Sequence, residues 1–227
     1  MLVNEQDDEQ VHTHDSSKTP GLDGLNVTTR FLAAVAFIPA SFYRYPRETA
    51  NYEISAFIFI GAMSLFVLSN CLEMISARNF GKNVAGHIMC ASGGSIIIAA
   101  NIIYMAPIII DGEPLIDVDA SLWITGSTFL VIGHLVETIT VARYYDNYVL
   151  ASKQAAALGI LGSLFFVIGS VLALEHFLLP NYDGGSIAAY IEDLEGNMTI
   201  QSALYLTGSS VYVLHAIVYT IAKYSRV

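Results

Sequence analysis

The sequence predicts an all-α, polytopic membrane protein: a helical bundle of five transmembrane helices, or six if one shorter segment also crosses. Of its 227 residues, 54% are hydrophobic and only 13% are charged, whereas soluble domains contain about 25% charged residues. Five apolar segments approach or exceed the roughly 18 to 20 residues that a helix needs to cross about 30 Å of hydrocarbon. These segments are 54–76, 85–110, 121–143, 155–179 and 201–223.

The chain before these segments divides into two parts. Residues 1–30 are polar and acidic and contain no apolar run, so we predict a solvated tail. Residues 31–43, FLAAVAFIPASFY, are apolar but short for a crossing, and they contain Pro39. We therefore predict that 31–53 forms an interfacial or re-entrant segment and a loop, and that 54–227 is the transmembrane domain.

Basic residues are unevenly distributed around the predicted spans. The loops 111–120 and 181–200 are acidic, whereas the other ends of the spans carry Arg78, Lys82, Arg143, Lys153, Lys223 and Arg226. Lys and Arg in short loops mark the cytoplasmic side of a membrane protein. The C-terminus is therefore expected in the cytoplasm, and the two acidic loops outside or in a lumen.

Four further residues bear on this orientation. Asn26 and Asn197 begin tripeptides of the N-glycosylation type on the predicted outer side, which supports the assignment. Arg44 and Arg47 are basic residues on that same side and oppose it.

Small residues recur every seven places within the spans. A glycine or serine stripe lets helix backbones approach closely in a membrane, where no hydrophobic effect acts between helices. We expect the following residues to pack helices together: Gly126, Ser127, Gly133, Gly162, Ser163, Gly169, Gly208 and Ser209. The same frame aligns 54–110 with 121–179 as tandem helical hairpins, and 201–223 begins a third copy.

A family resemblance lies in the segments 162–170 (GSLFFVIGS), 126–137 (GSTFLVIGHLVE) and 64–73 (SLFVLSNCLE). These segments resemble the helices of the YrhK-like family of small multi-span membrane proteins. The resemblance implies a multi-span membrane protein and supplies no catalytic residues. The sequence departs from the pattern at Ala62 and at His215, which stand where glycine is expected.

His134, Glu137 and His215 are the ionisable side chains predicted to lie deepest in the membrane. At about 1.5 Å per residue, they lie about 13, 9 and 12 Å from the nearer span ends. Glu73 and His87 lie closer to span ends, where a side chain reaches the headgroups. Because an ionisable group inside a span costs on the order of 2.5 to 3.5 kcal/mol, each deep group needs a partner.

Three interpretations of these deep side chains are open. In the first, which the sequence favours, they bond to polar groups on neighbouring helices, and the protein is a structural or accessory membrane subunit that packs through its glycine and serine stripes. In the second, His134, Glu137 and His215 line the pathway of a small proton or ion channel or transporter. In the third, His134 and His215 are the two axial ligands of a haem.

Other function classes are not supported by the sequence. The chain has no H-E-x-x-H, G-x-S-x-G or Walker motif, so no enzyme and no metal site are predicted. Cys71 and Cys90 are predicted to be buried free thiols. The net charge of −10 argues against nucleic acid as a partner. The expected partners are the lipid bilayer and other membrane proteins or a second copy of the chain.

Overall fold

The computed structural model describes residues 20–44, 52–79, 84–105, 116–144, 149–174 and 187–224. They form six helices: α1 (Pro20–Phe42), α2 (Tyr52–Asn79), α3 (Ala85–Met105), α4 (Ile116–Tyr144), α5 (Val149–Leu172) and α7 (Ile187–Tyr224). Each helix contains a stretch long and apolar enough to cross a membrane. The described chain has no strand, so the prediction of an all-α, multi-pass membrane bundle is confirmed.

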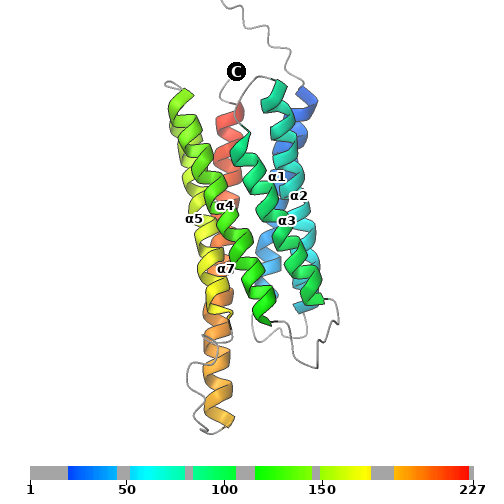
Figure 1. Ribbon diagram of the computed structural model, residues 1–227, viewed down its shortest axis with the longest axis vertical. Helices are drawn as coiled ribbons and strands as arrows, with labels where there is room; N and C mark the ends of the chain where they lie inside the picture. Colours follow the sequence, from blue (N-terminus) through cyan, green and yellow to red (C-terminus); the bar gives the residue numbers. More distant parts are fainter. Residues whose placement is uncertain are drawn as a thin grey trace, which may run out of the picture.

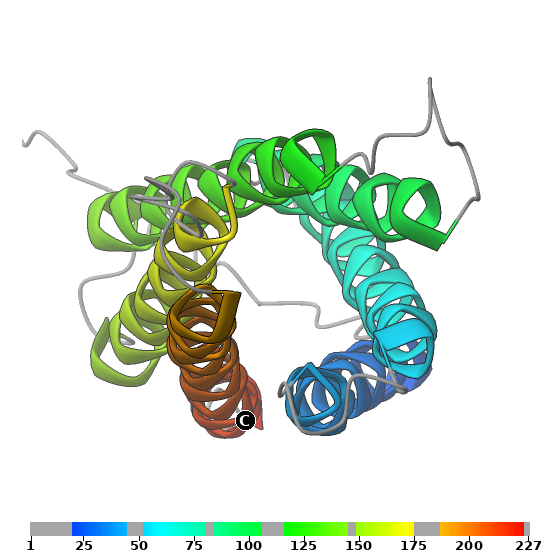
Figure 2. The same cartoon turned by 90° about the horizontal axis from the view of Figure 1, so that it is seen from below.

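The six helices are arranged as a ring (Figures 1 and 2). Each helix packs against its neighbours in the chain, and α1 packs against α7 to close the ring. The start of α1 and the end of α7 lie at the same end, where Lys223 Nζ is 2.9 Å from Asp23 Oδ1. We name this the terminal end of the ring and the opposite one the distal end.

A heptad pattern decides which face of each helix turns inward. Large buried side chains recur at this spacing, and small buried residues lie between them. A seven-residue repeat keeps one stripe of a helix on its neighbours along the whole length. The large inward residues include Phe37, Phe59, Phe66, Ile97, Trp123, Leu130, Phe166, Tyr205 and Tyr212. Outward positions carry exposed Leu, Ile, Val and Phe, as a lipid-facing surface requires.

The large inward residues meet inside the ring as an aromatic core. The Phe37 ring centroid is 6.1 Å from that of Phe166 and 5.7 Å from that of Tyr212. Further toward the distal end, Phe59 and Trp123 are edge to face at 5.1 Å. Such pairs contribute about 0.5 to 1.5 kcal/mol each beyond the area they bury. Aromatic packing therefore fills the ring.

Two glycine pairs bring α3 and α4 into backbone contact. A Cβ added to Gly93 would lie 2.5 Å from the Gly126 carbonyl oxygen, and one added to Gly133 would lie 2.9 Å from that of Gly86. The two pairs are one heptad apart on both helices. Neither helix could therefore carry a side chain at these positions without moving away from the other.

Helices α5 and α7 are joined in a similar way. A Cβ on Gly208 would lie 3.0 Å from a backbone oxygen of α5. On either side of this contact, Ser163 Oγ is 2.6 Å from Tyr212 Oη, and Ser170 Oγ is 2.8 Å from Tyr205 Oη. Each hydroxyl thus has a protein partner in place of the hydrogen bond to water that it would lose in a membrane.

The structure buries every residue that the sequence analysis expected to pack helices: Gly126, Ser127, Gly133, Gly162, Ser163, Gly169, Gly208 and Ser209. Ser209 also contacts α1, because its hydroxyl is 2.8 Å from that of Ser41. All six helices follow the same heptad pattern, so this pattern does not single out a two-helix unit. The tandem hairpin repeat therefore stays a prediction.

The N-terminal segment differs from our expectation. Residues 31–43 are not a short interfacial piece, because they continue a helix that begins at Pro20. The expected solvated tail is wrong for residues 20–30, because they form the first part of α1 and several of their polar side chains face protein; residues 1–19 lie outside the described residues. Asn26, Thr29 and Arg30 are only 2%, 5% and 3% exposed. Pro39 is tolerated inside the helix, as it is in membrane helices whose neighbours satisfy the backbone.

Several predicted boundaries also shift. Helix α4 begins at Ile116 and α7 at Ile187, so much of the predicted acidic loops 111–120 and 181–200 is helical. The first part of α7 extends beyond the other helices at the distal end (Figure 1). The expected ends of two spans, at 106–110 and 175–179, lie outside the described residues, as do Arg47 and most of the expected tail.

Candidate functional site

Most buried and half-buried ionisable side chains of the described residues lie near the terminal end of the ring, together with several polar groups. They come from α1, α2, α3, α4 and α7. We name them the polar cluster, which consists of Asn26, Arg30, Ser69, Asn70, Glu73, His87, Cys90, His134, Glu137, His215, Tyr219 and Lys223.

Two histidines lie at the inner limit of the polar cluster. The imidazole rings of His134 and His215 have centroids 5.1 Å apart, and these residues are 1% and 2% exposed. His215 Nδ1 is 2.6 Å from the Ala155 carbonyl oxygen, to which it must donate. Its Nε2, 3.4 Å from Arg30 Nη1, must therefore accept, because a guanidinium can only donate. His215 is thus held as a neutral imidazole.

Glu137 lies between two imidazoles. Its Oε2 is 3.2 Å from His134 Nδ1, and its Oε1 is 2.7 Å from His87 Nδ1. The side chains of Glu137 and His87 are 16% and 17% exposed, whereas that of His134 is 1% exposed. The carboxylate therefore joins a partly accessible histidine of α3 to a buried histidine of α4.

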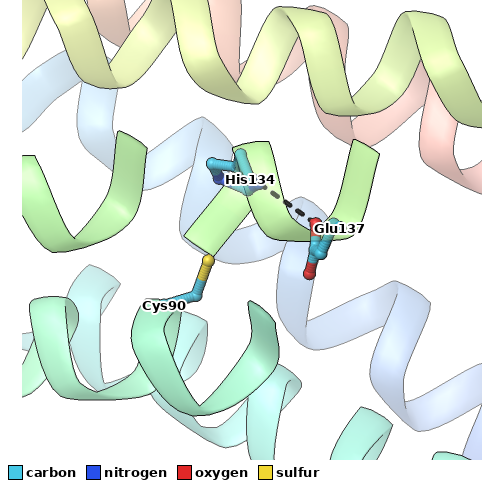
Figure 3. Close-up of side chains that lie close together, drawn as sticks. All are labelled: Cys90, His134 and Glu137. Carbon is cyan, nitrogen blue, oxygen red and sulfur yellow. Dashed lines mark hydrogen bonds and ion pairs between the residues drawn. The ribbon is translucent and has the colours of Figure 1, made fainter. Parts of the chain in front are cut away.

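The thiol of Cys90 lies beside this group, as Figure 3 shows. Its Sγ, a ring nitrogen of His134 and a carboxylate oxygen of Glu137 all lie within 4.8 Å of one another. Cys90 is a free, buried thiol, as predicted, whereas the other free cysteine, Cys71, is only partly buried. Three side chains with different ligand atoms thus converge between α3 and α4.

Glycines on three helices make room for these side chains. A Cβ on Gly86 would lie 2.6 Å from Glu137 Cγ, and one on Gly133 would lie 2.5 Å from Cys90 Sγ. A Cβ on Gly159 of α5 would lie 2.7 Å from His134 Cγ and Nδ1. The backbone therefore admits this arrangement only because side chains are missing at these positions.

Glu73 is the second carboxylate of the polar cluster. It accepts hydrogen bonds from Asn26 Nδ2 and Tyr219 Oη, and Lys223 Nζ lies 2.6 Å from its Oε1. Because Asn26 is buried in this network, its tripeptide is not accessible to glycosylation in the folded chain. This part of the sequence therefore gives no support to the predicted orientation.

Arg30 connects the two parts of the polar cluster. Its Nε donates to Ser69 Oγ at 3.0 Å, and its Nη1 lies 3.4 Å from His215 Nε2. The guanidinium carbon is 4.0 Å from the centroid of the Tyr219 ring. A buried arginine is thus held by a hydroxyl, an imidazole and an aromatic face.

A second arginine of α1, Arg44, lies at the distal end. Its guanidinium carbon is 4.8 Å from the centroid of the Trp123 ring and 5.1 Å from those of Phe59 and Tyr205. Arg44 therefore contacts the aromatic core. This contact gives Arg44 a packing role, so it is not simply a basic loop residue that reports the orientation in the membrane.

All three deep ionisable residues predicted from the sequence, His134, Glu137 and His215, belong to the polar cluster. The sequence pattern does not group them with Arg30, which falls in the expected tail, or with Cys90, which is expected as a buried free thiol. One signal was available: His87-x-x-Cys90 and His134-x-x-Glu137 have the same spacing. Residues three apart lie on one face of a helix.

A haem held between His134 and His215 would require their rings, whose centroids are 5.1 Å apart, to separate. Both ring nitrogens of His215 also have partners, Ala155 and Arg30. The haem interpretation stays a prediction.

Comparison of the chain with protein-family models finds no match, and comparisons with curated proteins and with solved structures find none either. The resemblance to the YrhK-like family therefore stays a prediction.

Proposed function

We propose that the protein is a membrane transporter of protons or small cations, with Glu137 and His134 as its binding groups. The observation that carries this proposal is a carboxylate between two imidazoles inside a ring of membrane-spanning helices. Ionisable groups at such positions are costly and typically mark ion or proton paths. Imidazole is the side chain that exchanges protons most readily near neutral pH.

The exposure of the polar cluster supports access from the terminal end. The side chains of Asp23, Lys223 and Glu73 are 34%, 17% and 15% exposed, whereas the two inner histidines are almost fully buried. The exposed fraction of these polar side chains therefore decreases from the terminal end inward, and they form a series along which a proton could reach the inner histidines. The distribution of basic residues assigns this end to the cytoplasmic side.

The aromatic core supports a barrier on the other side of the site. The ring of Tyr212 has its centroid 6.1 Å from that of His134, 5.6 Å from that of Phe166 and 6.0 Å from that of Phe66. The rings of Phe66 and Phe166 carry no hydrogen-bonding group, and the hydroxyl of Tyr212 is engaged by Ser163. Passage across the membrane therefore requires these rings to move, as alternating access does in transporters.

The test is proton flux into liposomes that contain the purified full-length chain and an internal pH dye. Under an imposed pH gradient, the wild-type protein should carry protons, and Glu137→Gln should reduce the flux to that of empty liposomes. The matched control is Glu53→Gln, because Glu53 is exposed near the distal end of α2. Equal flux for Glu137→Gln and the wild type, with equal incorporation, would contradict the proposal.

A structural or accessory subunit is the second candidate function. The densely packed aromatic core favours it, because the chain is a compact scaffold. The glycine pairs, however, join helices within the chain. A partner would have to pack on bulky outward residues such as Phe57 and Leu150, which are 62% and 72% exposed. Co-purification of a stoichiometric partner from native membranes, together with no ion flux, would favour this role.

A further inference from the structure

We propose that Cys90, His134 and Glu137, together with His87, bind a divalent transition-metal ion such as Zn²⁺. This inference names the class of cation for the site described above. It rests on the proposed function only for the binding role of Glu137 and His134, and it adds Cys90 and His87.

The four side chains form two facing pairs. His87 and Cys90 are three residues apart on α3, and His134 and Glu137 are three residues apart on α4, so each pair shares a helix face. The pairs meet across the glycine contacts of α3 and α4. Donor atoms of Cys90, His134 and Glu137 lie within 4.8 Å of one another, and His87 Nδ1 is 2.7 Å from Glu137 Oε1.

The donor atoms select a particular kind of metal. Thiolate sulfur, imidazole nitrogen and carboxylate oxygen are the ligands of tetrahedral zinc sites. Metal–ligand bonds of about 2.0 to 2.3 Å place tetrahedral donors about 3.3 to 3.8 Å apart. The donor atoms of Cys90, His134 and Glu137, which lie within 4.8 Å of one another, therefore need to draw together by at most about 1 to 1.5 Å. A sulfur ligand disfavours Mg²⁺ and Ca²⁺, which take oxygen.

The charge of the donor set also matches a divalent ion. Binding requires Cys90 to lose its thiol proton, which is released to solvent when the sulfur–metal bond forms. One thiolate, one carboxylate and two neutral imidazoles then carry a charge that a divalent cation cancels. A neutral site is the arrangement that a buried, membrane-embedded position favours.

His134, rather than His215, has ligand capacity to spare. Its Nε2 is buried and has no hydrogen-bond partner among the described residues. Both nitrogens of His215 are engaged by Ala155 and Arg30. The outer members of the set, Glu137 and His87, are 16% and 17% exposed and provide a route for the ion from the terminal end.

The test is titration of the untagged, full-length protein with Co²⁺ alone, in detergent, after reduction of thiols and removal of metals by a chelator. One Co²⁺ per chain should produce thiolate-to-cobalt charge-transfer absorption and the strong visible bands of tetrahedral coordination, and Zn²⁺ should abolish both. Cys90→Ser should lose the charge-transfer band and bind at least tenfold more weakly. Cys71→Ser is the matched control and should behave as the wild type.

A second measurement avoids mutation of the site. Because Cys90 is buried, it reacts with a maleimide only when the helices open transiently, and bound Zn²⁺ should slow this reaction at least tenfold and leave that of Cys71 unaffected. Absence of the charge-transfer band, or its survival in Cys90→Ser, would overturn the metal site. Proton flux separates this failure from a failure of the proposed function. If the wild-type protein binds no cobalt but Glu137→Gln still abolishes its proton flux, the proposal of proton transport stands and only the metal site is overturned.

Discussion

The imidazole rings of His134 and His215 lie 5.1 Å apart, although α4 and α7 are separated in the ring by α5. Their approach depends on Gly159 of α5, where a Cβ would lie 2.7 Å from His134. A helix with a side chain at this position would push His134 aside. The two histidines of the polar cluster therefore meet across non-neighbouring helices because Gly159, which lies between them, has no side chain.

Gly133→Ala should destabilise the fold. The added Cβ would lie 2.5 Å from Cys90 Sγ and 2.9 Å from the Gly86 carbonyl oxygen, so α3 and α4 must separate. We expect a loss of about 1 to 3 kcal/mol, typical of overpacking, measured as a lower midpoint of thermal unfolding in detergent. Gly61→Ala is the control, because nothing lies within 4 Å of its added Cβ. Equal midpoints for the two variants would contradict the close approach of α3 and α4.

Glu73→Gln should destabilise the protein far more than Asp23→Asn. Lys223 Nζ is 2.6 Å from Glu73 and 2.9 Å from Asp23, but Asp23 is the more exposed of the two carboxylates. Loss of Glu73 leaves Lys223 and the nearby Arg30 without a buried counter-charge, which costs about 3 to 5 kcal/mol. Loss of the exposed carboxylate costs less than about 1 kcal/mol. Chemical unfolding of both variants measures the difference, and similar losses would show that Glu73 does not hold the network.

Tyr212→Phe should cost about 0.6 to 1.7 kcal/mol, the range of hydrogen bonds between membrane helices. The substitution removes the contact with Ser163 Oγ, which is 2.6 Å from the Tyr212 hydroxyl. Ser163 keeps its bond to the Gly159 carbonyl oxygen, so no buried hydroxyl is left without a partner. Unfolding in detergent provides the measurement, and exposed Tyr224→Phe should have no effect. A loss of several kcal/mol would mean that the hydroxyl has a larger role.

Phe37→Ala should raise proton leak through the protein. Phe37 contacts Phe59, Phe166 and Tyr212 in the core between the polar cluster and the distal end. Removal of the ring opens space that water can enter, and it costs about 3 to 5 kcal/mol of stability. Flux into liposomes, normalised to folded protein, should increase, whereas Phe57→Ala on the outer surface should not change it. Unchanged flux through folded Phe37→Ala would contradict the role of the aromatic core as the barrier to protons.

The spans of α2, α3, α4, α5 and α7 were predictable because lipid-facing residues must be apolar over the length of a crossing. The sequence left the span of α1 open as a possible sixth crossing, because the apolar stretch 31–43 is short and the residues before it, including Asn26, Thr29 and Arg30, are polar. A single sequence does not show that such residues find Ser69, Glu73 and His215 on other helices. Hydropathy averages over both faces of a helix, and here the protein-facing side is polar.

The sequence by itself determined the membrane class, five of the six described helices and the position of His134, Glu137 and His215 within apolar spans, because hydropathy acts along the chain. It also predicted the small residues that pack helices. The tertiary structure alone decided that Cys90 and His87 join His134 and Glu137, and that Arg30 reaches His215. Those contacts depend on how closely neighbouring helices approach, and glycines opposite these side chains permit the approach.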